Sequence, residues 1–220
     1  MLIAVDIETI TEPGKEVTQA EIDAWNAAYT PSKEYKKPET IEKHKQEDYQ
    51  KWLNRTLLKT GRLKIVAIGL GRMHPYNFEL QDLEAKVSND PKELSDFFCN
   101  YVEHTHNAKG WLGYNVQLFD LLNICQLLDS QNADSLLKAS KFGVVDPCKY
   151  PLETRYKLKD ICRAFNIKSD DPELEYLDGS DVGKLWEVGN LDLLRRYCEL
   201  DIIRVVKLTR ALSRIYKLTG

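Results

Sequence analysis

Two acidic residues lie two positions apart near the start of the chain. Asp6 and Glu8 follow the apolar run LIAV, whose composition is typical of a buried strand. Because the side chains of a strand alternate between its faces, both carboxylates are expected on the same face. Two neighbouring carboxylates repel each other unless a cation lies between them. Such a pair is also typical of a solvated strand end, and the spacing alone does not distinguish these interpretations.

Two more acidic residues occur later in positions that have an ordinary structural interpretation as well. Asp120 follows a strand-like segment ending near Tyr114 and lies close to the start of the next expected helix, where aspartate often caps. Tyr197 and Asp201 are four residues apart in a strongly helical stretch, so they share one helix face. Each motif taken alone also fits a cap or a surface hydrogen bond.

The four acids taken in this order predict a site for two divalent cations, Mg²⁺ or Mn²⁺. Hydrolysis of a phosphodiester by two metal ions requires several hard oxygen ligands around cations about 3.5–4 Å apart. One cation would lower the pKa of a water molecule, and the other would stabilise the leaving 3′ oxygen. Tyr197, whose phenol has an ordinary pKa of about 10, would be protonated and would polarise that water.

Three short motifs of the chain resemble those of the DEDD exonuclease superfamily in its tyrosine-bearing subclass. They are Asp6-Ile-Glu8-Thr9, Asn115-x-x-x-Phe119-Asp120 and Tyr197-Cys-Glu-Leu-Asp201. The chain is most similar to stand-alone exonucleases related to the proofreading domain of family-B DNA polymerases. The segments Asp178-Gly179-Ser180-x-Val182 and Tyr156-Lys-Leu-Lys159-Asp160 also resemble that group, and the similarity covers residues 1–10 and 63–210.

The resemblance implies a role for each motif residue. The metal ligands would be Asp6, Glu8, Asp120 and Asp201, and Tyr197 would position the nucleophilic water. The residues that would contact the terminal nucleotide or its phosphate are Thr9, Ile10, Tyr114, Asn115 and Phe119. A position in the hydrophobic core explains Ile10 and Phe119 equally well.

Strand-like runs alternate with helical segments along most of the chain, which predicts an α/β domain with a mixed sheet. The resemblance implies a ribonuclease H-like mixed five-stranded sheet flanked by helices. Strands are expected at 2–8, 63–71, 76–80, 109–115 and 142–147. Helices are expected after Pro91 and at 119–130, 133–140, 157–165, 180–188 and 190–216. We expect one exonuclease domain over residues 1–220.

A long polar segment, residues 11–62, separates the first two expected strands where the family usually has a hairpin. Thr18 and Glu21 form a capping-box pattern ahead of a short helix, and 39–59 is helical in pattern but mostly charged. Residues 33–64 contain ten Lys or Arg residues and five acids, which gives a local net charge of +5. This insertion is either a flap that grips single-stranded nucleic acid or a solvated helical decoration.

Composition places few limits on function. The 220 residues carry a net charge of −3, so the chain is not a generally basic protein that coats nucleic acid. Five scattered cysteines without a C-x-x-C pair exclude the usual zinc spacings and argue against a disulfide framework. No run is long enough to span a bilayer. We expect a protein without a membrane anchor in a reducing compartment, cytoplasmic or nucleoid-associated.

The resemblance implies a 3′→5′ exonuclease that releases 5′ mononucleotides from single-stranded DNA. The chain has no room for a polymerase domain, so a DNA polymerase or repair partner would act in trans in proofreading or DNA repair. The preference for DNA over RNA follows from family likeness alone. The alternatives are a 3′→5′ exoribonuclease on short RNA and a catalytically silent nucleic-acid-binding module.

Overall fold

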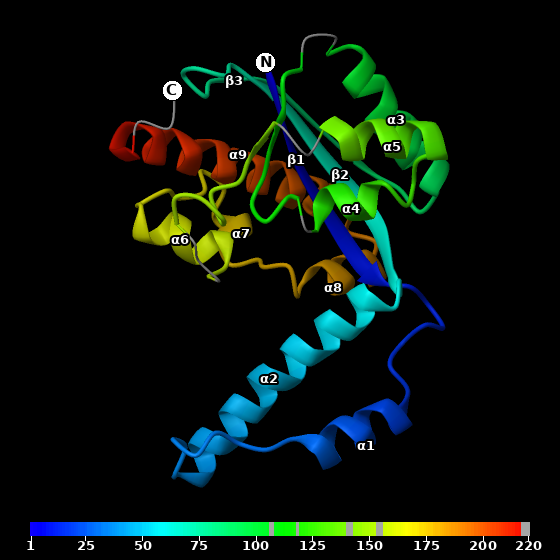
Figure 1. Cartoon of the computed structure of the whole chain (residues 1–220), viewed down its shortest axis with the longest axis vertical. Helices are drawn as coiled ribbons and strands as arrows, with labels where there is room; N and C mark the ends of the chain where they lie inside the picture. The colour runs from blue at the N-terminus through cyan, green and yellow to red at the C-terminus, as the bar shows by residue number, and fades with distance from the viewer. Residues whose placement is uncertain (106–107, 118, 140–142, 153–155, 217–220) are drawn as a thin grey trace. The chain divides into compact units, whose positions relative to one another are not determined.

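A five-stranded sheet organises the larger part of the chain. The computed structural model describes residues 1–105, 108–117, 119–139, 143–152 and 156–216. The strands are β1 (Leu2–Thr11), β2 (Leu63–Met73), β3 (Leu80–Val87), β4 (Trp111–Leu112) and β5 (Val144–Val145). They lie in the order β3-β2-β1-β4-β5, with β2 and β3 antiparallel and β1, β4 and β5 parallel (Figure 1). The predicted mixed five-stranded α/β fold is therefore confirmed.

The chain divides into two compact units, which are described separately. The first unit contains Met1–Thr9 and Ile65–Gly220, and the second contains Ile10–Lys64. The helices of the first unit are α3 (Pro91–Glu103), α4 (Asp120–Ile124), α5 (Ser130–Ala139), α6 (Leu158–Ala164), α7 (Pro172–Glu175), α8 (Val182–Glu187) and α9 (Leu191–Tyr216). The second unit contains α1 (Gln19–Ala28) and α2 (Pro38–Lys59).

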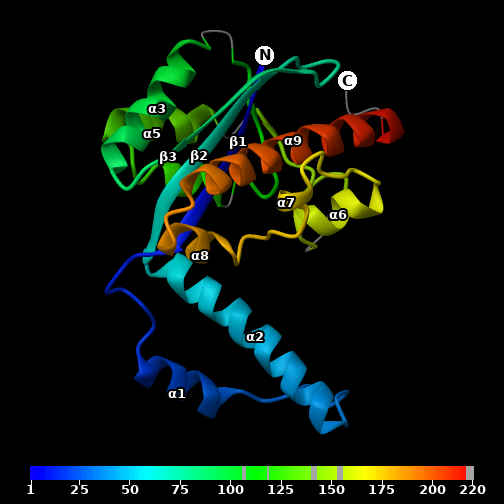
Figure 2. The ribbon, with the colours of Figure 1, turned by 180° about the vertical axis from the view of Figure 1, so that it is seen from behind.

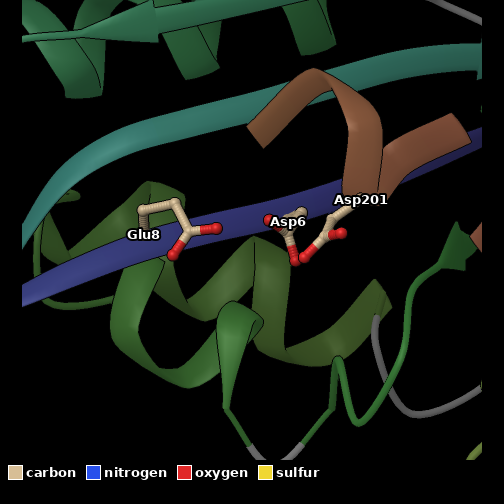
Figure 3. Close-up of side chains that lie close together, drawn as sticks. All are labelled: Asp6, Glu8 and Asp201. Carbon is tan, nitrogen blue, oxygen red and sulfur yellow. The ribbon is translucent and has the colours of Figure 1, made fainter. Parts of the chain in front are cut away.

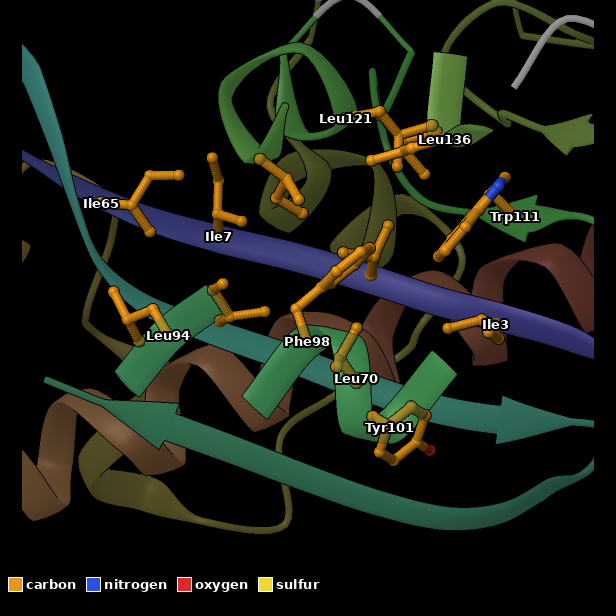
Figure 4. Packing of buried hydrophobic residues seen from close by; sticks show 14 residues of the cluster. Ile3, Ile7, Ile65, Leu70, Leu94, Phe98, Tyr101, Trp111, Leu121 and Leu136 are labelled. Carbon is orange, nitrogen blue, oxygen red and sulfur yellow. The ribbon is translucent and has the colours of Figure 1, made fainter. Parts of the chain in front are cut away.

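Helices cover both faces of the sheet in the first unit. One face packs against α3, α4 and α5, where Leu94, Phe98 and Leu121 meet Ile3 and other strand residues (Figure 4). The other face packs against α9, which crosses the sheet in the view from behind (Figure 2). Helices α6, α7 and α8 pack against α9. Burial of apolar side chains on both faces supplies the main stabilisation of this unit.

Alternation along β1 decides which residues meet α9. Leu2 and Ala4 belong to the cluster formed with Ile202 and Val205 of α9, whereas the odd-numbered residues of the strand enter the opposite core. Since the side-chain period of a strand is two, the next even-numbered residues project to the α9 face as well. Those residues are Asp6 and Glu8.

Two glycines of β2 allow α9 to lie close to the sheet. A Cβ atom at Gly69 would stand 3.0 Å from Sγ of Cys198 and 3.2 Å from Cγ1 of Ile202. A Cβ atom at Gly71 would stand 3.0 Å from Cγ2 of Ile202. These separations are tighter than most Cβ contacts in proteins, so any side chain here would push the helix away from the strands.

The second unit begins with the capping box predicted from the sequence. Thr18 accepts the backbone N–H of Glu21, and the Glu21 carboxylate accepts the backbone N–H of Thr18 at 2.8 Å. Both carboxylate oxygens of Glu21 also accept Arg62, at 2.9 and 3.0 Å. This bidentate ion pair joins the start of α1 to the segment that leads into β2.

Several predicted boundaries are wrong. The strand expected at 76–80 is a turn, in which His74 donates to the Glu79 carbonyl at 3.0 Å, and the real strand β3 begins at Leu80. Its charged, edge-strand sequence offers no apolar run to detect. The helix expected at 119–130 ends at Ile124, because Leu127 then donates to Ile124 in a tighter turn.

The other differences concern lengths and one short helix. The strands expected at 109–115 and 142–147 are each only two residues long, as β4 and β5. Helix α7 has no counterpart among the expected elements. Residues 140 and 142, which end a predicted helix and begin a predicted strand, lie outside the described residues. Within the described parts of the chain, no helix is both long and apolar enough to cross a membrane.

Replacement of Gly69 by alanine is expected to destabilise the protein by about 1–3 kcal/mol, because the new methyl group overpacks the seam between β2 and α9. Chemical denaturation measures this change. Gly183→Ala is the matched control, since a Cβ there meets nothing within 4 Å and should stabilise α8 by about 0.5–1 kcal/mol. Equal stabilities of the Gly69 variant and the native chain would show that α9 is not held at close contact.

Candidate metal centre

Three carboxylates converge where β1 meets α9. One ligand oxygen each from Asp6, Glu8 and Asp201 lies within 4.8 Å of the others. Figure 3 shows Asp6 and Glu8 on β1 and Asp201 approaching them from α9. The carboxylate of Glu8 is buried, whereas those of Asp6 and Asp201 are half-buried. The alternation of β1 and the position of α9 together bring acids 195 residues apart in sequence (6 to 201) into one cluster.

Asp120 is tied to the same strand by a hydrogen bond. It is the first residue of α4, and its Oδ1 accepts the backbone N–H of Ile7 at 3.0 Å. Ile7 lies between Asp6 and Glu8, so Asp120 is fixed beside the strand segment that carries both. Asp120 is only 3% exposed, and it stands outside the group of three ligand atoms. An aspartate that could have been a simple cap therefore belongs to the acidic centre.

Ionisation of the carboxylates in this centre is energetically unfavourable. Burial raises the pKa of Asp6 well above its ordinary value, and the charges of Glu8, Asp201 and Asp120 raise it further. Burial likewise raises the pKa of Glu8, with Asp201 and Asp120 adding to the effect. Burial raises the pKa of Asp120 to about 8, against the N–H donors of Ile7 and Asp120 itself. A divalent cation would relieve this repulsion, and carboxylate oxygens are the hard ligands that Mg²⁺ and Mn²⁺ favour.

Arg204 is a buried cation in the centre that sequence reasoning missed. Its Nη1 lies 2.8 Å from Oδ1 of Asp201, and the residue is only 2% exposed. Burial raises the pKa of Asp201, while the charge and hydrogen bond of Arg204 oppose that rise. The spacing of three residues along one helix was the available signal, but many surface pairs share it.

Tyr197 stands one helical turn before Asp201 and is buried with it. The residue is 5% exposed, and burial followed by the charges of Asp201, Glu8 and Asp6 raises the pKa of its phenol. A hydrogen bond from Tyr197 favours the charged form of Asp201. A phenol with a raised pKa remains protonated and can donate a hydrogen bond beside the carboxylates.

Cys198 also lines the centre, a position with no counterpart among the predicted site residues. Its Sγ lies 3.8 Å from Oδ2 of Asp6, in the space left by Gly69. Burial and then the charge of Asp6 raise the pKa of this thiol. The thiol is therefore uncharged and packs between the strands and the helix.

The five residues predicted to contact nucleotide lie in different environments. Thr9 and Ile10 continue β1, with Ile10 buried in the second unit. The Tyr114 hydroxyl donates to the Tyr156 carbonyl at 2.7 Å, and its ring packs against the buried cluster of Cys162, Leu208 and Leu212. Phe119 packs on the core under α4. Packing thus accounts for Tyr114 and Phe119, and neither belongs to the carboxylate cluster.

Asp146 fixes the loop that carries Asn115, and sequence reasoning missed it. Asn115 adopts a left-handed backbone with φ of 60°, and its N–H donates to Oδ1 of Asp146 at 2.9 Å. The same oxygen accepts the Cys148 N–H at 3.0 Å. Oδ2 of Asp146 is buried and has no hydrogen-bond partner among the described residues. An Asp-Pro pair after a short strand was the only signal, and it is common in turns.

Comparisons with known proteins bear on this arrangement. The family model of the RNase H superfamily matches residues 55–213. A search of curated proteins finds no match. Among solved structures, the family B DNA polymerase from the hyperthermophilic archaeon Pyrobaculum calidifontis is similar, with a TM-score of 0.54 and 14% identity. The similarity covers 96% of this chain and 24% of the polymerase, so this chain spans about a quarter of that protein's length. At this identity, the likeness concerns the fold.

The metal-free protein is expected to lose stability relative to its Asp120→Asn variant as pH rises. The folded carboxyl has a pKa of about 8 against an ordinary 3.8, so the folded state binds the extra proton across this window. Its contribution is fully present below about pH 3.8 and is lost as pH rises through about 8. The difference should grow by at most about 1.4 kcal/mol per pH unit.

Denaturant unfolding in chelator at several pH values measures this difference. Added Mn²⁺ should stabilise the native chain more than the variant, because a cation replaces the proton at the centre. Parallel stability curves for the two proteins would contradict the charge repulsion described above.

Proposed function

Because the chain belongs to the RNase H superfamily, we propose that its acidic centre hydrolyses phosphodiester bonds with divalent cations. The reaction we propose is 3′→5′ exonucleolytic cleavage of single-stranded DNA, with release of 5′ mononucleotides. One observation carries this proposal, the convergence of Asp6 and Glu8 with Asp201, which lies one turn after a buried Tyr197 on α9. A hydrolase of this kind needs a dense cluster of hard ligands and a neutral donor beside it.

Each side chain of the centre has a part in the proposed reaction. Asp6, Glu8, Asp120 and Asp201 would hold the cations, Mg²⁺ or Mn²⁺. When bound, two cations supply an activated water and stabilise the leaving oxygen. Tyr197 would orient that water through its neutral hydroxyl. Arg204 already occupies Oδ1 of Asp201, which leaves the other oxygen of that carboxylate for a cation.

The charge distribution disfavours a silent binding module. Four buried or half-buried acids around one internal arginine destabilise the metal-free fold, and a module that only binds nucleic acid gains nothing from them. The preference for DNA is supported by the resemblance of the three motifs to polymerase-related exonucleases. A polymerase or repair complex on another chain is the partner class that this resemblance suggests.

Loss of either Asp6 or Asp201 is expected to abolish cleavage. Single strands of DNA and RNA labelled at the 5′ end are incubated with Mg²⁺ or Mn²⁺, and a descending ladder of products is expected for the native chain on DNA. Asp6→Ala and Asp201→Asn should give no ladder, and chelator should have the same effect. Asp170→Asn is the matched control, because that carboxylate side chain is 97% exposed. A ladder that survives Asp6→Ala would refute the metal assignment, and faster cleavage of RNA would favour the exoribonuclease.

Replacement of Tyr197 by phenylalanine should slow cleavage by about a hundredfold, the scale of losing one aligned donor. Mn²⁺ binding followed by titration should change little, since the phenol is not assigned as a ligand. Tyr101→Phe is the matched control, a buried tyrosine whose hydroxyl pairs with Asp82 instead. Its cleavage rate should stay near that of the native chain. Equal rates for the Tyr197 variant and the native chain would remove the proposed role.

A further inference from the structure

The second unit, Ile10–Lys64, presents four aromatic side chains, three on its two helices and one directly after α1. We call this set, Trp25, Tyr29, Tyr49 and Trp52, the aromatic face. The Trp25 ring centroid lies 5.2 Å from Tyr29, 5.1 Å from Tyr49 and 5.8 Å from Trp52. All four side chains are only half-buried, and helix α1 contains no buried residue. The rings therefore hold the two helices together and still expose aromatic surface to solvent.

A cavity of about 560 Å³ opens beside this face. Trp25, Ile22 and Tyr49 supply its apolar wall, and Asn26, Gln46 and Gln50 supply carboxamides. Its volume lies within the range of roughly 300–1,000 Å³ that small-molecule sites occupy. A flat ring can pack on the aromatic wall while its polar edge meets the carboxamides, which both donate and accept hydrogen bonds. This combination suits a nucleobase.

Charged side chains of both signs lie at and near the cavity. The Nζ of Lys45, another lining residue, is held 5.9 Å from the centre of the Tyr29 ring. Lys36, Lys37 and Lys43 are exposed on the segment that leads into α2 and on α2 itself. Glu42 and Glu47 also line the cavity, and Glu47 pairs with His44 at 3.2 Å. The net charge of +5 on residues 33–64 lies at 51–64, whereas residues 33–50 carry five lysines and five acids. Among the described residues, Lys36, Lys37 and Lys43 form no ion pair of their own, so these three ammonium groups are available to an anionic ligand.

We propose that the second unit binds single-stranded nucleic acid, with a base in the cavity against Trp25 and Tyr49 and phosphates on Lys36, Lys37 and Lys43. Aromatic stacking with a basic groove is the general physical basis of binding to single strands without strict sequence preference. This site rests on the proposed function only in the identity of its ligand, and its residues belong to the second unit, whereas the carboxylates belong to the first.

The charge contribution is tested by binding in chelator, where no hydrolysis occurs. The full chain is titrated into a fluorescent oligothymidylate, and anisotropy gives affinity at several salt concentrations. The triple change Lys36→Gln, Lys37→Gln and Lys43→Gln should weaken binding at least tenfold. It should also reduce the slope of log affinity against log salt by about 0.7 per lost contact.

A matched triple change serves as the control for charge. Lys92→Gln, Lys138→Gln and Lys184→Gln remove the same charge from lysines of the first unit whose side chains are 78%, 71% and 78% exposed. This control should bind nearly as tightly as the native chain. If both triples weaken binding equally, attraction is a property of overall charge and the proposal is overturned.

The base-binding contribution is tested with two further arms. The pair Gln46→Glu and Gln50→Glu leaves the aromatic rings in place and adds negative charge to the cavity, so it should weaken binding without lowering thermal stability. An abasic strand of equal length, with phosphates but no bases, should bind at least tenfold more weakly than oligothymidylate. Equal binding of the abasic strand, or of polyglutamate, would overturn a site for nucleobases.

Cleavage measured in Mn²⁺ separates this proposal from the proposed reaction. In one outcome, the native chain cleaves DNA and the variant with all three lysines of the second unit replaced binds normally in chelator. That outcome would refute the second-unit site and leave the proposed hydrolysis intact. In another outcome, the native chain does not cleave DNA, but the same variant binds more weakly than the native chain. That outcome would refute the hydrolysis and support the second-unit site.

Discussion

The close packing of α9 on the sheet is the constraint on which the acidic centre depends. Gly69 and Gly71 leave no side chain between β2 and the helix, so Cys198 and Ile202 reach the strands directly. Asp201 on that helix then meets Asp6 of the neighbouring strand. The same approach removes water from the carboxylates, and burial is the largest cause of their raised pKa values. Apolar packing along the rest of α9 must offset this unfavourable free energy, which bound cations would lower.

Asp120 at the start of α4 and Asp146 after β5 show that acidic side chains here also hold the backbone in place. Asp120 accepts the N–H of Ile7, so that a proposed metal ligand fixes the strand that carries two others. Asp146 accepts the N–H of Asn115 and thereby stabilises a left-handed residue between β4 and α4. A change at either position would alter both charge and loop geometry. Kinetic effects of such changes therefore require the structural controls that exposed residues such as Asp170 allow.

Much of this arrangement could be predicted from residue types and spacing. The apolar run before Asp6, the capping box at Thr18 and the long apolar period of α9 depend on local sequence, and the structure contains the corresponding elements. Strand β3 was misplaced because an edge strand rich in charge has no apolar run. Arg204, Cys198 and Asp146 could not be found, because their importance arises from contacts between segments distant in sequence. The polar composition of residues 11–62 indicates an insertion between the first two strands. The cavity of the second unit, however, depends on how its two helices pack.

The alternation of β1 makes the chain tolerant of length change on one side of Glu8 and intolerant on the other. Leu2, Ala4, Asp6 and Glu8 share one face only because no residue is inserted or deleted among them. A single residue added between Ala4 and Asp6 would turn both acids into the apolar core on the opposite face and place aliphatic side chains against α9 instead. Just beyond Thr9, by contrast, the chain accommodates an entire additional unit before β2. An insertion immediately downstream of the acids is therefore compatible with the acidic centre, whereas one residue added or removed within 2–8 is not.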